Sequence, residues 1–331
     1  MSKGKELRLR FGDAGIWVRA DSDQLVKPLQ NYLSRHLVRE HSCPARLELH
    51  WQKTLSPIPT HAGLVLRYFG LKVFFESGRT YFTDFRSYLT LEPDGKNAVG
   101  FISPETLEEG GRHFFTHIFF TIALFEMLRH QGIFFLHAAG LVSPEGKSLV
   151  FPASAGQGKS TLALYLIREG FKYLSDDTIF LSRSRGRVFI SGFQKLSHLP
   201  EEIFSRFPEL KLFKNAPRLE SKGKRMVDLE KVFPDRRSPG SSAPGALVFL
   251  QKTEEGKSRL APLSKHSAFQ LLLDQSPFAY LNPALAQEHL NILRDFVASN
   301  SAWALASGSD WTKNPRLLTT LLAAALNGSG S

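Results

Sequence analysis

The sequence predicts an α/β fold built around a phosphate-binding loop, preceded by a smaller α+β module. The apolar run SLVFP (148–152) leads into a glycine-containing loop, and this loop leads into the amphipathic segment TLALYLIREGF (161–171). A strand before such a loop and a helix after it are the context that a phosphate-binding loop requires. Before residue 103, short apolar alternations between turn residues predict strands. We therefore expect an N-terminal α+β module over 1–103 and a nucleotide-binding α/β domain over 104–331 with a helical C-terminal part.

Local periodicity predicts the elements of the N-terminal module. LRLRF (7–11) and GIWVRA (15–20) alternate polar and apolar residues on either side of a turn, and 21–37 has a helix-start signal followed by helical apolar spacing. Five further segments alternate with period two, as in a meander: LELHW, LVLRYF, LKVFFES, RTYFTDF and YLTLEP. They contain no catalytic constellation, so we expect a structural or recognition role for this module.

The second domain is predicted from longer apolar segments. After Ser-Pro-Glu at 103–105, a mostly apolar stretch predicts one helix that ends at Arg129. Strands are predicted for the segments on both sides of the loop and further on: IFFLHAAGLV, KSLVFPA, YLSDDTIFLSR, RVFISGF and GALVFLQ. Beyond 251 the apolar spacing predicts helices alone: HSAFQLLLDQ, LAQEHLNILRDFVASN and PRLLTTLLAAALN.

Composition excludes several classes of protein. The chain has 331 residues, of which 42% are hydrophobic and 22% charged, as in a soluble globular protein. Its single cysteine, Cys43, excludes a disulfide framework and a cysteine-based zinc cluster. The first residues lack an apolar signal-peptide core, and the most apolar window, 114–125, is shorter than the ~20 residues that span a bilayer. We therefore expect a cytoplasmic protein without a membrane segment.

The net charge of +11 raises the question of nucleic-acid binding. Part of this charge is local, because 211–237 holds nine Lys or Arg against four Asp or Glu. No zinc knuckle, aromatic RNA-binding signature or helix-turn-helix pattern accompanies it, which disfavours a nucleic-acid partner. A basic segment that follows a phosphate-binding loop is better suited to nucleotide phosphates or an acidic substrate.

The loop itself resembles the pattern G-x-x-x-x-G-K-[ST], with Ala153 at the position of the first glycine. Its glycines permit the backbone turns that aim successive N–H groups at an anion. Lys159 is then placed to reach the β- and γ-phosphates, and Ser160 or Thr161 to offer a hydroxyl to Mg²⁺. The predicted nucleotide-binding residues of the loop are Ala155, Gly156, Gln157, Gly158, Lys159, Ser160 and Thr161. The alternative is a glycine-rich turn with an accidental Lys-Ser pair.

Two adjacent carboxylates, Asp176 and Asp177, follow about fifteen residues after the loop, at the end of an apolar run. Adjacent strand residues point to opposite faces, but both can serve one site where the strand ends and the chain turns. One carboxylate would then hold the metal while the other accepts a proton from an attacking hydroxyl. The alternative for this pair is a surface turn with a helix-capping aspartate.

The segment LHAAGLVSPEGKSLVFPASAGQGKSTLALYLIREGFKYLSDDTIFL (136–181) resembles the core of HPr kinase/phosphorylase and of related phosphoenolpyruvate carboxykinase-like P-loop proteins. The shared features are a strand that carries a histidine, the phosphate loop, a helix that ends in glycine, and a strand that closes in an acidic pair soon after the loop. The resemblance is good over 134–195, extends to about 252 and is absent over 1–103. It implies a P-loop kinase core of the HPr kinase/phosphoenolpyruvate carboxykinase type.

The resemblance also implies roles for individual residues. Lys159 would contact phosphate, Ser160 and Asp177 would hold Mg²⁺, and Asp176 would be the base, with the order within the acidic pair left open. His137 would lie near the transferred phosphoryl group or the acceptor, which makes it a candidate catalytic residue beside Lys159 and the two aspartates.

Further downstream, GKRMVDL (223–229) looks like a basic turn that relatives use near the phosphates, so Lys224 and Arg225 are further candidates. Two departures from the family limit the resemblance. The C-terminal Gly- and Arg-rich segment with which HPr kinases engage their protein substrate is not found, and the N-terminal region differs from theirs.

Together these features predict an ATP- and Mg²⁺-dependent kinase that transfers the γ-phosphoryl group to an alcohol. The acceptor would be a serine of a peptide or protein, or a small hydroxylated metabolite. Two alternatives stay open: a nucleotide-binding regulatory module without transfer, and a nucleic-acid-linked NTPase that charge alone supports. The sequence does not name the acceptor or choose between ATP and pyrophosphate, and it leaves a homo-oligomer open.

Overall fold

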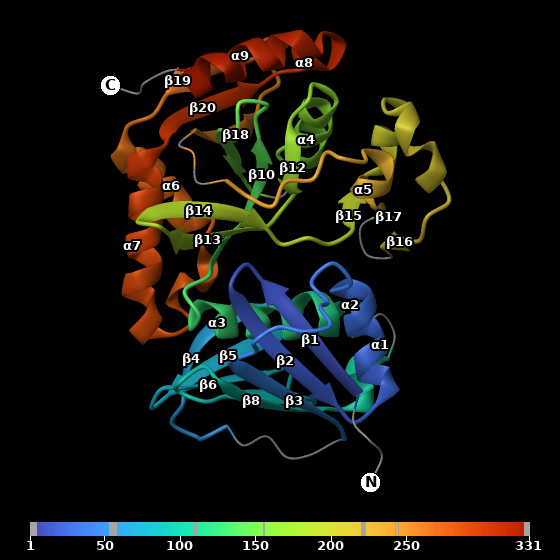
Figure 1. The fold of residues 1–331 in the computed structure, drawn as a ribbon, viewed down its shortest axis with the longest axis vertical. Coiled ribbons are helices and arrows are strands. Elements are labelled where there is room, and N and C mark those ends of the chain that lie inside the picture. Colours follow the sequence, from blue (N-terminus) through green and yellow to red (C-terminus); the bar gives the residue numbers. More distant parts are fainter. Residues whose placement is uncertain are drawn as a thin grey trace. The chain divides into compact units, whose positions relative to one another are not determined.

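The computed structural model describes residues 5–52, 58–108, 111–154, 156–219, 223–241, 243 and 245–327. Its fold is mixed α/β, with several mixed sheets (Figure 1). Contacts divide the chain into two compact units, one made of Met1–Phe134 and Phe278–His289, the other of Phe135–Pro277 and Leu290–Ser331. Contacts alone do not define an independently folding domain, so the division predicted at 103/104 stays a prediction. None of the described helices is long and apolar enough to cross a membrane.

The first unit contains an eight-stranded sheet in the order β1-β2-β3-β8-β7-β6-β5-β4. Neighbouring strands are antiparallel except β2/β3 and β3/β8, which are parallel. The seven predicted strands are confirmed: β1 (Lys5–Phe11), β2 (Ala14–Ala20), β3 (Ala45–Trp51), β4 (Gly63–Tyr68), β5 (Leu71–Glu76), β6 (Arg79–Thr83) and β7 (Tyr88–Leu91). An eighth strand, β8 (Asn97–Ile102), was not predicted. Strand β1 illustrates the alternation of buried and exposed residues, because every second residue from Leu7 to Phe11 is buried.

The helices of this unit differ in part from the prediction. Helix α1 (Asp23–Tyr32) begins where expected, since the Ser22 side chain accepts a hydrogen bond from the Gln24 N–H at 3.2 Å, but it ends before residue 37. The single helix predicted to end at Arg129 is divided into a 3-10 turn (Pro104–Leu107), α2 (Gly111–Phe114), a π-helical turn (Phe115–Phe120) and α3 (Thr121–Arg129). Apolar spacing does not distinguish a π turn from α-helix, so the sequence pattern does not reveal this division.

The second unit is built on a six-stranded sheet in the order β12-β10-β11-β18-β20-β19. The central pairs β11/β18 and β18/β20 are parallel, whereas β10/β11, β10/β12 and β19/β20 are antiparallel. The strands are β10 (Ala138–Val142), β11 (Ser148–Pro152), β12 (Lys172–Ser175), β18 (Ala246–Lys252), β19 (Arg259–Pro262) and β20 (Ser301–Ser307). The prediction of helices alone beyond 251 is wrong for β19 and β20.

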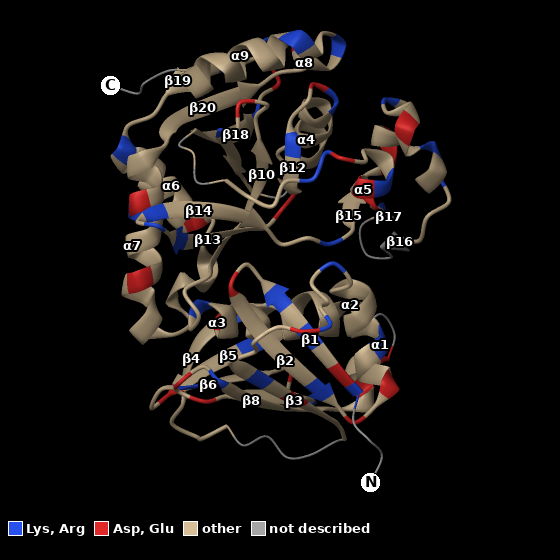
Figure 2. Ribbon diagram, viewed as in Figure 1, with Lys and Arg blue, Asp and Glu red and all other residues tan. Residues whose placement is uncertain are grey.

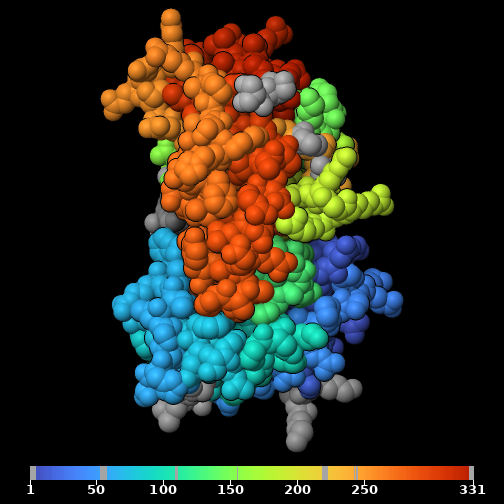
Figure 3. Space-filling model, turned by 90° about the vertical axis from the view of Figure 1, so that its left-hand side faces the viewer, coloured from blue at the N-terminus to red at the C-terminus, as the bar shows by residue number. Residues whose placement is uncertain are grey.

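The helices predicted around this sheet are confirmed: α4 (Lys159–Arg168), α6 (Lys265–Asp274), α7 (Pro283–Ser299) and α9 (Pro315–Asn327). A short helix, α8 (Asp310–Lys313), precedes α9. Figure 3 shows, in orange and red, the surface that the C-terminal segments present. Helix α4 packs against the sheet through a core that joins Leu162 and Leu166 to Leu149, Phe151 and Val248, and this core fixes the position of the loop between β11 and α4.

Two three-stranded sheets complete the second unit. One has the order β14-β13-β9 and contains β9 (Phe134–Leu136), β13 (Ile179–Ser184) and β14 (Arg187–Gly192). The other has the order β15-β17-β16 and contains β15 (Ser197–Leu199), β17 (Lys224–Val227) and β16 (Arg218–Leu219). Two 3-10 helices (Glu201–Ser205 and Pro208–Phe213) and α5 (Leu229–Val232) accompany the second. Basic and acidic segments are interspersed in this region (Figure 2).

Candidate functional site

The predicted phosphate-binding loop joins the buried strand β11 to the first turn of α4. Gly156 and Gly158 have φ of +87° and +92°, a conformation that residues with a side chain rarely adopt. A Cβ atom at either glycine would meet nothing within 4 Å, so both face open space. The loop therefore has the backbone turns and the helix N-terminus that an anion nest needs. The predicted binding residue Ala155 lies outside the described residues.

Ala153, the residue in place of the first glycine of the pattern, belongs to the hydrophobic core. Only 5% of its surface is exposed, and it clusters with residues such as Leu162 and Phe151. It is not one of the described residues with positive φ. Alanine therefore satisfies the backbone at this strand exit, and its methyl group packs inward instead of towards the loop.

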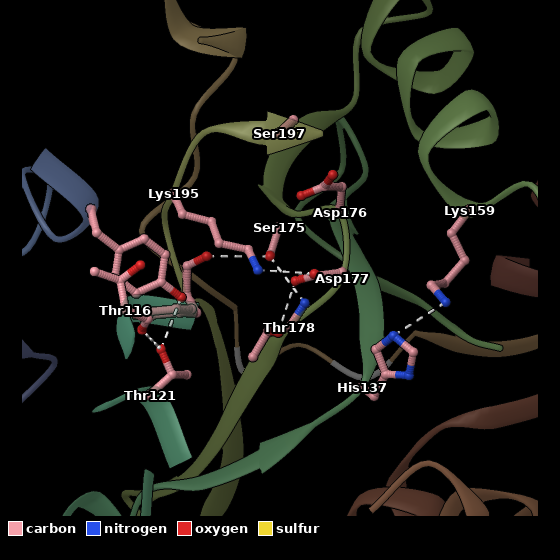
Figure 4. A network of polar contacts seen from close by, with 12 residues as sticks. Thr116, Thr121, His137, Lys159, Ser175, Asp176, Asp177, Thr178, Lys195 and Ser197 are labelled. Carbon is pink, nitrogen blue, oxygen red and sulfur yellow. Dashed lines mark hydrogen bonds and ion pairs between the residues drawn. The ribbon is translucent and has the colours of Figure 1, made fainter. Parts of the chain in front are cut away.

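Lys159 begins α4 and turns its side chain back along the loop. Its Nζ donates to the carbonyl oxygens of Ala153 and, at 3.1 Å, Ser154, and lies 3.5 Å from Nε2 of His137 (Figure 4). Burial lowers the pKa of Lys159 to about 8, although the charges of Asp177 and Asp176 oppose this shift. The ammonium is thus ionised near neutral pH and already surrounded by oxygen and nitrogen acceptors.

The sequence predicts His137 within one strand, IFFLHAAGLV, but the structure divides this segment into β9 and β10, and His137 lies between them. Its backbone N–H donates to the Gln275 carbonyl at 3.0 Å, which holds the residue in place. Burial, and then the positive charge of Lys159, lower its pKa to about 4. The imidazole is therefore neutral at pH 7, and its Nε2 is free of a proton when it accepts from the Lys159 ammonium.

The remaining loop residues hold the loop or line its helical side. The side-chain oxygen of Gln157 accepts a hydrogen bond from the Lys252 backbone N–H at 2.8 Å, so Gln157 ties the loop to the end of β18. Ser160 and Thr161 lie in the first turn of α4, and both are half-buried. Gln157 therefore has a structural contact. The hydroxyl-bearing residues Ser160 and Thr161 lie at the end of the loop, where the sequence predicts a contact with the metal.

The acidic pair follows β12 directly, and its two carboxylates point in different directions (Figure 4). Asp176 is the more buried of the two, with 6% of its surface exposed. Its Oδ1 accepts from the Tyr173 hydroxyl at 3.0 Å, and the same Tyr173 oxygen lies 3.1 Å from Oγ of Ser197 in β15. Burial, and then the neighbouring Asp177 charge, raise the pKa of Asp176 to about 6.

Asp177 is held by a different set of groups. Its Oδ1 accepts from the Thr178 hydroxyl at 2.8 Å, and its Oδ2 lies 2.9 Å from Nζ of Lys195. Burial disfavours ionisation, but the Lys195 ammonium and the Thr178 hydroxyl outweigh it and keep the pKa of Asp177 below its usual range. The Asp177 side chain is 40% exposed, so part of its carboxylate faces solvent.

The two downstream candidates, Lys224 and Arg225, are adjacent in β17 and have different environments. Arg225 pairs with Glu201 of the 3-10 helix Glu201–Ser205 at 2.8 Å and donates to the Ala216 carbonyl, before β16, at 3.0 Å. Lys224 lies close enough to Lys159 for its charge to contribute to lowering the pKa of Lys159. The charge of Lys224 thus acts on the loop lysine, whereas Arg225 makes contacts away from the loop.

Sequence reasoning missed two residues that contact the acidic pair, Tyr173 and Lys195, and Ser197, which contacts Tyr173. Tyr173 was within the quoted motif, three residues before Asp176, but a tyrosine at this spacing has no recognisable signature. Lys195 and Ser197 come from a later segment that no motif connects to the pair. Their roles depend on how β12, β14 and β15 are arranged, which the local pattern does not encode.

The residues present fit a nucleotide and a magnesium ion. The loop offers open space beside two positive-φ glycines, together with a lysine ammonium, and Asp177 offers a partly exposed carboxylate. Within the described part of the chain, no group of three or more His, Cys, Asp or Glu is placed to hold a metal. Mg²⁺ is usually bound by one or two carboxylates together with waters and substrate phosphates, and Asp177 would be such a carboxylate.

Comparison with known proteins gives a distant similarity. No family model matches the sequence, and no curated protein matches it. Among solved structures, the chain is similar to the Hpr(Ser) kinase/phosphatase from Coxiella burnetii, with a TM-score of 0.32 and 15% sequence identity over 57% of this chain and 87% of that chain. A likeness at this level carries no argument about function, so membership of that family stays a prediction.

Proposed function

We propose that this protein is an ATP- and Mg²⁺-dependent kinase that transfers the γ-phosphoryl group to an alcohol. The acceptor class is a serine of a peptide or protein, or a small hydroxylated metabolite. The observation that carries the proposal is the presence, within one compact unit, of a glycine-turned loop ending in Lys159 and an acidic pair whose charges act on that lysine.

The loop would bind the phosphates of the nucleotide. Its backbone N–H groups and the N-terminus of α4 favour negative charge, and the Lys159 ammonium would exchange its carbonyl contacts for phosphate oxygens. Ser160 and Asp177 would hold Mg²⁺, which neutralises charge between the phosphates when it is bound. Most of the catalysis would then come from positioning and charge neutralisation, because the protein has little covalent work to perform.

Transfer requires a base for the acceptor hydroxyl, and Asp176 is our candidate. As the acceptor oxygen bonds to the γ-phosphorus, the bond between this phosphorus and its bridging oxygen breaks, ADP leaves, and the hydroxyl proton passes to the Asp176 carboxylate. A pKa of about 6 suits a base near neutral pH, whereas the lowered pKa of Asp177 suits a metal ligand. His137, neutral and bonded to Lys159, would orient that ammonium beside the transferred group.

A regulatory nucleotide-binding module is the alternative, and one observation favours it. Asp176 is nearly buried and already accepts a hydrogen bond from Tyr173, so an acceptor hydroxyl would have to reach a carboxylate that is engaged inside the protein. In such a module, nucleotide binding would change the environment of the acidic pair without phosphoryl transfer.

The two functions are separated by an acceptor screen. The purified chain is incubated with γ-labelled ATP and Mg²⁺, together with serine-containing peptides or hydroxylated metabolites, and transfer of label is measured. The kinase predicts acceptor-dependent labelling that Asp176→Asn abolishes while ATP binding persists. ATP binding without labelling of any acceptor would favour the module, and ADP release that only nucleic acid stimulates would favour an NTPase.

A further inference from the structure

Lys195 is fastened to the turn that carries the acidic pair, although the two are far apart in the sequence. It lies two residues after Phe193, whose N–H donates to the Thr178 carbonyl at 3.1 Å. The Ser175 hydroxyl donates to the Phe193 carbonyl at 3.3 Å. The turn is thus bonded to the Lys195 segment from both of its ends, just before and just after Asp176 and Asp177, so the position of Lys195 is built into the fold.

The Lys195 side chain reaches Asp177 from the protein side. Only 13% of this side chain is exposed, whereas Asp177 is 40% exposed. Its ammonium lies 2.9 Å from Oδ2 of Asp177 and 5.9 Å from the centre of the Phe193 ring, which is itself buried. Lys195 therefore occupies the inner side of the carboxylate, and the solvent-facing side stays accessible.

The charges around the pair suit an anion better than a free metal ion. Lys159 and Lys195 each act on this group of residues, and the charge of Lys224 acts on Lys159. A divalent ion on Asp177 would share its carboxylate with a nearby ammonium, and like charges repel at this range. A triphosphate removes the conflict, because its oxygens can pair with both the ion and the ammonium groups.

We propose that Lys195 is the resident counter-cation of Asp177 and competes with a divalent metal for this carboxylate, so that Lys195 weakens metal binding until nucleotide is present. The proposal rests on the proposed function for the identity of the ligand. Lys195 is a positioning residue in this account: it keeps Asp177 oriented in the free protein and leaves it when a metal binds, which nucleotide favours.

The test measures metal binding without nucleotide or turnover. Mn²⁺ is titrated into the full chain and free Mn²⁺ is followed by electron paramagnetic resonance, for wild type, Lys195→Met, Lys195→Arg and the exposed control Lys172→Met. We expect Lys195→Met to bind Mn²⁺ about fivefold more tightly, the factor that matches an ion pair of about 1 kcal/mol. Lys195→Arg, which keeps the charge, and Lys172→Met should stay within about twofold of wild type.

A second measurement follows Lys195 in the wild-type protein and does not need Lys195→Met, in case that variant does not fold. Lysine is labelled with ¹³C at Cε, and the Lys195 signal is assigned by its absence from Lys195→Arg. Saturating Mg²⁺ should shift this signal as the ammonium leaves Asp177, and the Lys172 signal should stay in place.

Equal or weaker Mn²⁺ binding by folded Lys195→Met, or a Lys195 signal that Mg²⁺ leaves unchanged, would overturn the proposal. These outcomes are distinct from failure of the kinase itself. If Lys195→Met binds metal more tightly but the wild-type protein transfers no phosphoryl group, the counter-cation role of Lys195 is supported and the kinase proposal is rejected. If the wild-type protein transfers phosphoryl groups but Lys195→Met has unchanged metal affinity, the kinase proposal is supported and the counter-cation role is rejected.

Discussion

The two sides of the candidate site are built in different ways. The loop side is contiguous: Ala153 to Thr161 follow one another between a strand and a helix, and their chemistry is visible in the sequence. The acidic side is assembled from Asp177 after β12, Lys195 after β14 and Ser197 in β15. The comparison teaches that a short motif predicts the kind of ligand a site could bind, while residues brought together by the fold decide which groups pair with its charges.

The largest effect is expected on the acidic side, from Asp176→Asn. A carboxamide cannot accept the hydroxyl proton, so the transfer rate should fall by ~10²–10⁴ while ATP affinity changes little. Asp177→Asn is the matched variant, since it should in addition raise the Mg²⁺ concentration needed for half-maximal activity. Steady-state transfer with the true acceptor at varied Mg²⁺ checks both. Full activity in both variants would show that Asp176 and Asp177 have no catalytic role and only form a turn.

On the loop side, Lys159→Ala should weaken ATP binding by roughly 10- to 100-fold, the size expected for lost hydrogen bonds to a charged ligand. The core around α4 should persist, because the Lys159 ammonium contacts only loop carbonyls and His137. Calorimetry with Mg²⁺ measures the affinity, and the exposed control Lys172→Ala should bind as wild type does. Equal affinity in wild type and Lys159→Ala would exclude a phosphate-binding role for the loop.

His137 gives the loop side a pH signature. Its pKa is about 4 in the folded state against an ordinary value of 6.5, so the unfolded chain binds more protons between these values. Stability should therefore fall as pH drops from about 6.5 to 4, and His137 should account for about 1–3 kcal/mol of that loss. His137→Gln keeps an acceptor for Lys159 but does not titrate. Urea unfolding across this range should show the wild-type advantage shrinking on acidification, and a constant difference would contradict the shift.

The smallest effect is expected from Ala153→Gly. Because the methyl is buried in the core and lies away from the loop, ATP affinity should change by no more than a few-fold. Stability should fall by ~1–2 kcal/mol through lost burial and a more flexible unfolded chain. The buried control Ala139→Gly on β10 should lose a similar amount. Gly158→Ala should instead impair binding, since φ there is +92°. A hundredfold gain in ATP affinity for Ala153→Gly would mean that the natural loop is weakened.

The sequence predicts the parts of this fold whose signals are local. Alternation identified β1 to β7 of the first unit but not β8, and the strand, loop and helix around Lys159 were recognisable because all of their signals lie within one short segment. Strand β20 was missed, since the small-residue run around Trp303 carries no strong period and becomes a strand through parallel pairing with β18. Lys195 was missed for the same reason, because the role of a lone lysine depends on the carboxylate that the fold places beside it.

Whether the loop and the acidic pair act on one ligand is tested most directly by the effect of Mg²⁺ on ATP affinity. Calorimetric titrations with and without Mg²⁺ are compared for wild type and Asp177→Asn, at one ionic strength. The account predicts that Mg²⁺ tightens ATP binding by at least about tenfold in wild type, the effect of one added charge-assisted contact. It also predicts that this gain is lost in Asp177→Asn, while affinity for metal-free ATP is kept. The same gain from Mg²⁺ in both proteins would show that the acidic side takes no part in binding the nucleotide, and would contradict the account.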